Sequence, residues 1–383
     1  MNTGVIGVMG SGLIGTDPYE ENSWSGSSRF FFAECGRQRW LHRAFGVDAP
    51  AVLRYPLMLR NFSSDRELWR QRFYLDTTYY RVLSRRIVAG LRPDEGAHPV
   101  LQIGGIYNLR PGIGSSRKLY SYHDGNLAQH RLSPQFPAGV SARRVARALA
   151  YERAVCEGID HIFTMSEYLR RSFIEDFGVP AGRVTTVGAG INLESLPAPA
   201  PDKDFDSRKL LFLGSDFERK GGIELLHAFR RVRIAHPDAE LNIVGPRQLQ
   251  IPSGLAAGVN YHGFLSKKDP QQRQRLERLL RACSLFVLPS RYEPFGIAPL
   301  EAMAYEVPAV LTRRWAFPEM VQPGVNGELV ELGDADELAG KLIALLRDPD
   351  RLRDMGRAAR VMVMERFTWP KVVQKMRAAT GTT

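Results

Sequence analysis

Short apolar runs alternate with helix-forming segments along most of the chain, and this alternation limits the fold more than any other feature of the sequence. In the first half, the strand-like runs are residues 4–9, 100–105, 118–122, 161–166 and 184–192. In the second half, they are residues 210–214, 241–245, 259–264, 285–290 and 307–312. Strands that alternate with helices in this way predict an α/β protein with doubly wound parallel sheets.

A proline-rich break divides the alternation into two series. Residues 197–202 read Pro-Ala-Pro-Ala-Pro-Asp, which is typical of a linker. The chain has 383 residues, more than one ordinary core needs. We therefore predict one Rossmann-like domain at residues 1–195 and a second at residues 205–364.

The composition excludes several classes of protein. Hydrophobic residues make up 44% and charged residues 24%, as in ordinary globular proteins. No apolar run reaches the roughly 18 residues of a membrane-spanning helix, and no signal-peptide pattern opens the chain, so we expect a cytoplasmic protein. Three widely spaced cysteines favour buried, reduced thiols over a disulfide framework or a zinc cluster.

The net charge of +11 allows for anionic partners. No nucleic-acid-binding motif accompanies this charge, so we expect no nucleic acid as a partner. Residues 64–91 have a helical period, with arginines on one face. That face is either an ordinary solvated surface or a site of peripheral contact with an anionic membrane.

Residues 10–15 spell GxGxxG, the pattern of dinucleotide-binding loops. A dinucleotide site needs a helix at once after this pattern and an acidic residue about 20 positions further on. Here a polar loop follows, and we expect the first helix at residues 27–39. A long first loop, in which Ser25 and Gly26 let a ligand approach the backbone, fits these residues better.

The run at residues 285–290 leads into the most informative stretch, residues 291–304. It predicts a strand, a loop and a helix start, with Glu293 in the loop and Glu301 in or near the first helical turn. A helix start has unpaired N–H groups and a partial positive charge, which suit a phosphate. Residues 215–222 end another strand in the same way and place Arg219 and Lys220 before two glycines, which predicts a second anion site.

His123 and Asp124 follow the strand-like run at residues 118–122. Ligands of open parallel sheets bind at the carboxyl ends of strands, so this pair lies where a site is expected. Taken alone, it is either structural or functional.

These motifs resemble the retaining glycosyltransferases of family 4, which have the GT-B fold. Residues 293–301 match the E-x7-E motif of that family, and residues 161–166, 188–190, 219–222 and 324–327 are similar to other family segments. The resemblance implies two Rossmann-like domains that face each other across a cleft. It also implies that a C-terminal helix, about residues 365–383, crosses back to the first domain.

The resemblance implies a transfer of a sugar from a UDP- or GDP-linked donor to an acceptor hydroxyl, with retention of configuration and without a metal or another cofactor. The acceptor would be a sugar, a glycan, a lipid-linked molecule or a small molecule. Glu293 and His123 would bind the transferred sugar, and Lys220 the diphosphate. The full set of donor-side residues that it implies is Ser25, Gly26, Arg219, Lys220, Phe264, Leu265, Phe295, Gly296, Ile297 and Glu301.

The sequence also departs from the family pattern. Ser215 stands where members often have Arg, Glu306 where a glycine is usual before Val-Pro, and Trp315 with Ala316 where two glycines commonly precede Pro-Glu. A nucleotide-sugar epimerase on the same fold and a non-catalytic nucleotide-sugar-binding protein stay open as alternatives.

Overall fold

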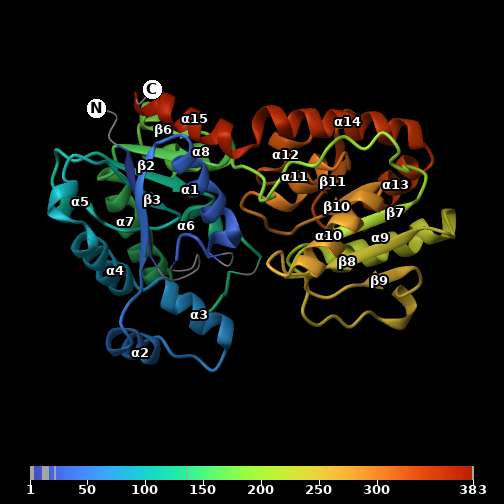
Figure 1. The fold of residues 1–383 in the computed structure, drawn as a ribbon. Helices are drawn as coiled ribbons and strands as arrows, with labels where there is room; N and C mark the ends of the chain where they lie inside the picture. Colours follow the sequence, from blue (N-terminus) through green and yellow to red (C-terminus); the bar gives the residue numbers. More distant parts are fainter. Residues whose placement is uncertain (1–3, 11–16, 21–22, 135, 382–383) are drawn as a thin grey trace. The chain divides into compact units, whose positions relative to one another are not determined.

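The computed structural model describes residues 4–10, 17–20, 23–134 and 136–381, except for the side chain of Ser25. Two compact units divide the chain (Figure 1). Unit 1 is Met1–Gly190 with Trp369–Thr383, and unit 2 is Ile191–Thr368.

The strands of unit 1 that the structure describes form one six-stranded sheet in the order β2-β1-β3-β4-β5-β6, and all neighbours are parallel. Their bounds are β1 (Val5–Gly10), β2 (Leu41–Val47), β3 (Val100–Ile103), β4 (Leu119–His123), β5 (His161–Thr164) and β6 (Val184–Thr186). The chain moves from β1 to β2 on one side and then to β3 on the other. The order therefore reverses between β1 and β3.

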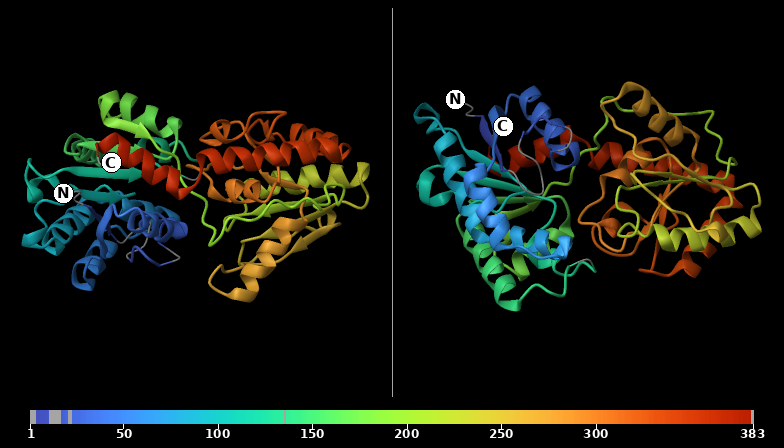
Figure 2. Two further views of the ribbon diagram at one scale, coloured as in Figure 1. Left: turned by 45° about the horizontal axis from the view of Figure 1, so that its top comes forward. Right: turned by 90° about the horizontal axis from the view of Figure 1, so that it is seen from below.

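Helices cover both faces of this sheet (Figure 2). They are α1 (Ser27–Arg37), α2 (Ala51–Arg60), α3 (Arg66–Tyr74), α4 (Thr77–Gly90), α5 (Arg110–Ile113), α6 (Leu127–His130), α7 (Ala142–Glu157), α8 (Glu167–Glu175) and α15 (Trp369–Thr380). The shorter 3-10 turns are η1 (Ser23–Gly26), η2 (Pro93–Glu95) and η3 (Ala181–Arg183).

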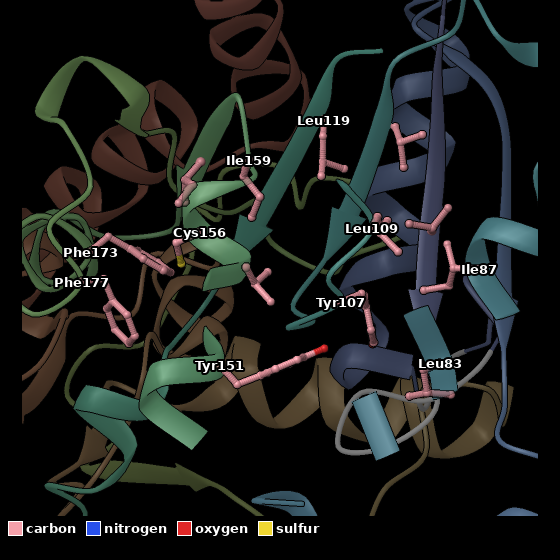
Figure 3. Close-up of a cluster of buried hydrophobic side chains, with 14 of the residues drawn as sticks. Leu83, Ile87, Tyr107, Leu109, Leu119, Tyr151, Cys156, Ile159, Phe173 and Phe177 are labelled. Carbon is pink, nitrogen blue, oxygen red and sulfur yellow. The ribbon is translucent and has the colours of Figure 1, made fainter. Parts of the chain in front are cut away.

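The core on one face of the sheet of unit 1 joins α4, α7 and α8 to the strands. Figure 3 shows Leu83 and Ile87 of α4, Tyr151 of α7 and Phe173 of α8 in this cluster, and all four are buried. The apolar periods of these helices place their buried residues on the sheet side, and burial of that surface is the main stabilising contribution.

The opposite face of the sheet holds a cluster of aromatic rings. The ring of Phe31 of α1 lies 5.4 Å from Tyr122 of β4 and 5.8 Å from Trp369 of α15, between ring centroids. Gln38 donates a hydrogen bond to the carbonyl of Pro370 (3.1 Å). These contacts make the C-terminal helix α15 a part of unit 1.

The region of helical period at residues 64–91 forms two helices, α3 and α4. The chain breaks at Leu75 and Asp76, and the side chain of Asp76 accepts the N–H of Thr78 (3.0 Å) at the start of α4. Leu83 and Ile87 of α4 are buried, whereas Leu68 and Phe73 of α3 are only half-buried. An N-cap in the middle of a continuous apolar period causes the break.

The described strands of unit 2 form a second six-stranded parallel sheet, in the order β12-β11-β10-β7-β8-β9. Their bounds are β7 (Lys209–Leu213), β8 (Glu240–Val244), β9 (Val259–Tyr261), β10 (Leu285–Leu288), β11 (Ala309–Thr312) and β12 (Gly327–Val330). Every residue of β10 and β11 is buried, as in parallel strands covered on both faces. Together the two sheets confirm the predicted doubly wound α/β class.

The helices of unit 2 complete its two outer layers. They are α9 (Gly222–Ala235), α10 (Pro270–Ala282), α11 (Ile297–Ala304), α12 (Phe317–Met320), α13 (Ala335–Leu346) and α14 (Pro349–Arg366), with the 3-10 turn η4 (Ser253–Leu255). The side chain of Asp334 caps α13 by accepting the N–H groups of Asp336 and Glu337, as its position before the helix predicts.

Cys35, Cys156 and Cys283 are all free and buried, as the sequence predicts. Burial raises the pKa of each of these thiols. Within the residues that the structure describes, no helix is both long enough and apolar enough to span a membrane.

Candidate active site

The loops after β7 and β10 lie side by side at the carboxyl edge of the sheet of unit 2. These strands are neighbours, yet the chain leaves β7 for β8 and β9 before it returns to β10. The strand order reverses here, and the crevice at such a reversal is the usual ligand site of an open α/β sheet. The N–H of Arg291 donates to the carbonyl of Arg219 (2.9 Å) and joins the two loops.

Gly221 lets the two loops approach this closely. Its φ of +75° lies in the left-handed region, and it precedes the first residue of α9. A Cβ at this position would overlap the carbonyl oxygen of Pro289 in the neighbouring loop. Only glycine meets both demands, so the Lys-Gly-Gly sequence fixes Lys220 at the start of α9.

Lys220 forms an ion pair with Glu293 across the two loops. Its Nζ donates to Oε2 of Glu293 at 2.6 Å, and the exposed fractions of the two side chains are 13% and 11%. Arg219 lies beside the pair and donates from Nη1 to the carbonyl of Tyr292 (2.8 Å). The structure thus brings Arg219, Lys220 and Glu293 together, as the sequence predicts.

Glu293 leads into α11 through Phe295 and Gly296. Gly296 has a φ of +97° and precedes the helix, and a Cβ there would come within 2.7 Å of the Phe317 ring. In the described chain, no side chain caps the start of α11 or of α9. The N–H of Gly222, the first of α9, already donates to the carbonyl of Phe217 (2.8 Å), so an anion would be bound by the next N–H groups of α9 and by the first ones of α11.

Glu301 lies further along α11, buried, and is also paired with a lysine. Lys267 Nζ donates to Oε1 of Glu301 at 2.5 Å and to the carbonyl of Asn192 at 3.2 Å. The sequence pattern did not identify Lys267. Its only signal is its place two residues after Leu265, which the family resemblance puts on the donor side.

Phe264 and Leu265, two of the donor-side residues that the family resemblance implies, lie in the loop after β9. The Phe264 ring is 49% exposed, and the guanidinium of Arg247 lies 5.4 Å from its centroid. Leu265 is half-buried beside it. An exposed ring with a cation on its face can stack on a planar base.

His123 of unit 1 is the last residue of β4. It is buried against the Phe173 ring (5.1 Å between centroids), and its Nε2 has no hydrogen-bond partner among the described residues. Burial lowers the pKa of His123 to about 4, so the imidazole is neutral at pH 7. A buried, unpaired ring nitrogen is suited to a hydroxyl of a ligand.

The glycine loop of unit 1 is described in part. Gly26 has a φ of +84° and precedes α1, which begins at Ser27 as predicted. The side chain of Ser25 lies outside the described residues, as do residues 11–16 of the GxGxxG pattern. A dinucleotide site needs a helix directly after residue 15. In the described chain, the first α-helix, α1, begins well after residue 15, at Ser27.

Two of the departures from the family pattern lie in backbone conformations that usually favour glycine. Glu306 and Trp315, which replace usual glycines, have φ values of +59° and +62°. The backbone conformation that favours glycine is therefore kept without glycine. In the described part of the chain, no group of three or more His, Cys, Asp or Glu residues could hold a metal ion.

Comparisons with known proteins agree with this geometry. Residues 32–195 match the family model described as Glycosyltransferase Family 4, and residues 199–362 match Glycosyl transferases group 1. The MMP alpha-(1->4)-mannosyltransferase of Mycolicibacterium hassiacum is 30% identical over 223 residues, which cover 58% of this chain and 54% of that relative. The chain thus spans about half the length of this curated relative.

Two solved structures share the fold over nearly the whole chain. Sucrose-phosphate synthase from Thermosynechococcus elongatus superposes with a TM-score of 0.69 at 20% identity and covers 98% of both chains. Anabaena HepE in complex with UDP-glucose gives a TM-score of 0.65 at 17% identity, over 99% of this chain and 100% of that one. These likenesses show the GT-B fold.

Proposed function

Because residues 32–195 belong to Glycosyltransferase Family 4 and residues 199–362 to Glycosyl transferases group 1, we propose that the protein transfers a sugar from a UDP- or GDP-linked donor to an acceptor hydroxyl. Configuration at the transferred carbon is retained. The observation that carries this proposal is the Lys220–Glu293 pair at the strand-order reversal, between two helix starts without side-chain caps.

The charges of this site suit a leaving diphosphate. As the bond from the sugar to the diphosphate breaks, negative charge grows on the phosphate oxygens. Lys220, Arg219 and the N–H groups at the start of α9 and α11 stabilise that charge where it develops. Two cations and two helix starts supply this stabilisation in the proposed reaction without a metal.

Glu293 and Glu301 act as hydrogen-bond acceptors in this proposal. Glu293 accepts hydroxyls of the transferred sugar and Glu301 those of the ribose, with Phe264 and Leu265 at the base. Both carboxylates already hold a lysine, so neither is proposed as a nucleophile. The acceptor oxygen attacks from the side of the leaving group, and its proton passes to a leaving phosphate oxygen.

His123 is proposed to bind the transferred sugar as a neutral group. Since burial lowers its pKa to about 4, its Nε2 can exchange a hydrogen bond with a sugar hydroxyl at neutral pH without adding charge. The proposed partners are a nucleotide sugar and a sugar, glycan, lipid-linked or small-molecule acceptor. If the acceptor is lipid-linked, we expect peripheral contact of the protein with an anionic membrane.

The test begins with a thermal-shift panel of UDP- and GDP-linked sugars in buffer with EDTA, since a ligand of the native state raises apparent stability. A donor that gives a shift then enters transfer assays with the anomeric configuration of the product determined. Lys220→Ala and Glu293→Gln should each lower kcat/KM by roughly 10²- to 10³-fold. Lys371→Ala changes an exposed lysine of α15 and serves as the control.

Three outcomes would overturn the proposal. They are unchanged transfer in both site variants, inversion of configuration, and donor turnover to an isomeric nucleotide sugar without any acceptor. The last would assign an epimerase.

A further inference from the structure

Two joined recesses lie between α4 and α7 of unit 1. The first, of about 330 Å³, lies at the starts of both helices, and the second, of about 690 Å³, continues along them toward α5. Thr77 and Arg147 line both, so the recesses form one groove. We call it the arginine groove after Arg60, Arg81, Arg85, Arg143, Arg144 and Arg147, which line it.

The arginine groove carries far more positive than negative charge. Asp76 is the one carboxylate in its lining, and this side chain already pairs with Arg60 and accepts from Asn61 (2.8 Å). Within the described chain, Arg81, Arg85, Arg143 and Arg147 make no ion pair. Six like charges that share one carboxylate repel each other, so the groove is suited to an anion.

Arg144 shows how crowded these charges are. It donates to the carbonyl of Arg72 (2.7 Å) and to Oδ1 of Asn61, which fix its guanidinium. Burial lowers its pKa, and the charges of Arg72, Arg60 and Arg147 add to this effect against the opposing charge of Asp76. The guanidinium is thus held in place beside other cations.

The topology places the first recess at the same edge of the sheet as His123. The helix α7 leads into the start of β5, and α4 leads back toward β3, so both helices run against the strands and begin at the carboxyl edge. His123 ends β4 at that edge. Ser141 precedes α7 but its side chain does not cap the helix, which leaves N–H groups that favour an anion.

The second recess adds apolar surface to the arginines. Val88 of α4 and Ala150 and Ala154 of α7 line it. Tyr151 of α7 also lines it and belongs to the buried cluster drawn in Figure 3. The lining therefore suits a molecule with an anionic group and an uncharged body.

We propose that the arginine groove binds a phosphate ester, and that this phosphate belongs to the acceptor of the transfer reaction. Guanidinium groups grip phosphate oxygens through paired hydrogen bonds, which Arg forms better than Lys. The assignment to an acceptor rests on the proposed function, whereas the binding of a phosphate ester does not. Soluble phosphate esters and lipid headgroups share this chemistry.

The experiment measures binding by the full chain without donor or turnover. One probe is sn-glycerol 3-phosphate by calorimetry, and the other is vesicles with phosphatidylglycerol by sedimentation. Arg85→Gln/Arg147→Gln removes two groove charges. Arg86→Gln/Arg171→Gln removes two exposed charges on α4 and α8 that do not line the groove, so the two variants have equal net charge.

We expect the groove variant to bind at least one probe roughly tenfold more weakly or worse, because it loses two charge-assisted guanidinium–phosphate contacts. The control variant should stay within about twofold of the natural chain. If the groove variant binds glycerol 3-phosphate more weakly, the ligand is a soluble ester. If only its binding to vesicles is weakened, the ligand is a lipid headgroup. Equal loss in both variants, or binding of glycerol as strong as that of its phosphate, would overturn the proposal.

The two proposals can fail separately. A chain that binds phosphate esters through the groove but transfers no sugar contradicts the proposed function, and with it the assignment to an acceptor, but not the binding of a phosphate ester by the groove. A chain that transfers sugar but binds neither probe contradicts only the groove.

Discussion

The cations of the candidate site in unit 2 lie against carboxylates, whereas the arginines of the groove in unit 1 share a single one. Lys220 has Glu293 and Lys267 has Glu301, at 2.6 and 2.5 Å. In unit 1, Asp76 is the one carboxylate of the groove's lining. A paired site is neutral and rigid before its ligand arrives, while an unpaired groove attracts anions at a distance and is weakened by salt.

Two buried ionisable groups of unit 1 differ from the paired carboxylates of unit 2. His123 and Glu152 of unit 1 are buried without an ion pair in the described chain, and burial moves the pKa of His123 down to about 4 and that of Glu152 up to about 7. Both groups are therefore pushed toward their neutral forms. These two groups of unit 1 avoid charge, while the two carboxylates of the candidate site in unit 2 are paired with lysines.

The largest expected effect concerns the close packing of the two loops in unit 2. Gly221→Ala would place a Cβ on the Pro289 carbonyl in a left-handed backbone, so we expect a loss of roughly 3–5 kcal/mol in the free energy of unfolding. Gly340→Ala, on α13 with nothing within 4 Å of its Cβ, should instead stabilise by about 0.5–1 kcal/mol. Urea denaturation measures both, and equal effects would contradict the packing argument.

The next effect tests the ion pair between Lys220 and Glu293. Glu293→Gln leaves Lys220 almost buried without its carboxylate, so the free energy of unfolding should fall by about 2–4 kcal/mol. Arg147→Gln in the groove should change it by less than about 0.5 kcal/mol, or raise it. A double variant, Lys220→Met/Glu293→Gln, should recover part of the loss. A similar loss for Glu293→Gln and Arg147→Gln would remove the distinction between the units.

A third effect depends on pH. Because the pKa of Glu152 is raised to about 7 by burial, the native chain keeps this proton after the unfolded chain has lost its own near pH 4.5. Stability should therefore fall as pH rises from 4.5 to 7, by on the order of 2–3 kcal/mol. Glu152→Gln should lack this part of the slope in urea titrations at pH 5 and pH 8. The same slope in both proteins would show that Glu152 is ionised when folded.

The smallest effect concerns the left-handed positions. Glu306→Gly removes a side chain from a φ of +59°, and the relief of backbone strain is offset by the greater freedom of the unfolded glycine chain. We expect a net gain below about 1 kcal/mol by thermal unfolding. A loss above about 1 kcal/mol would show that contacts of the Glu306 side chain outweigh the strain.

Sequence patterns predict most of unit 2 because each segment that carries its site forms from neighbouring residues. Residues 285–304 contain a strand, a loop and a helix in succession, and β10 and α11 form within them. The start of α1 at Ser27 is likewise set by short-range signals. Pairings between loops, such as Lys267 with Glu301, depend on distances across the fold that no local period records.

Unit 1 was harder to predict for physical reasons. The edge strand β2 is half-exposed and has no clean apolar run, and α2 contains Pro56, which ordinarily argues against a helix. The arginine groove joins α4 to α7, more than 50 positions apart. Residues 64–91 revealed the basic face of Arg81 and Arg85, but only the fold brings Arg147 next to it.

The burial of all three cysteines makes the chain a convenient host for thiol-directed labels. The thiolate is the reactive form, and burial raises the pKa of Cys35, Cys156 and Cys283 while it shields them from reagents. One cysteine placed at an exposed residue of each unit would therefore react far ahead of the natural three. Fluorophores attached there would follow the separation of the two units as nucleotide sugars and phosphate esters are added, with no need to remove a natural cysteine first.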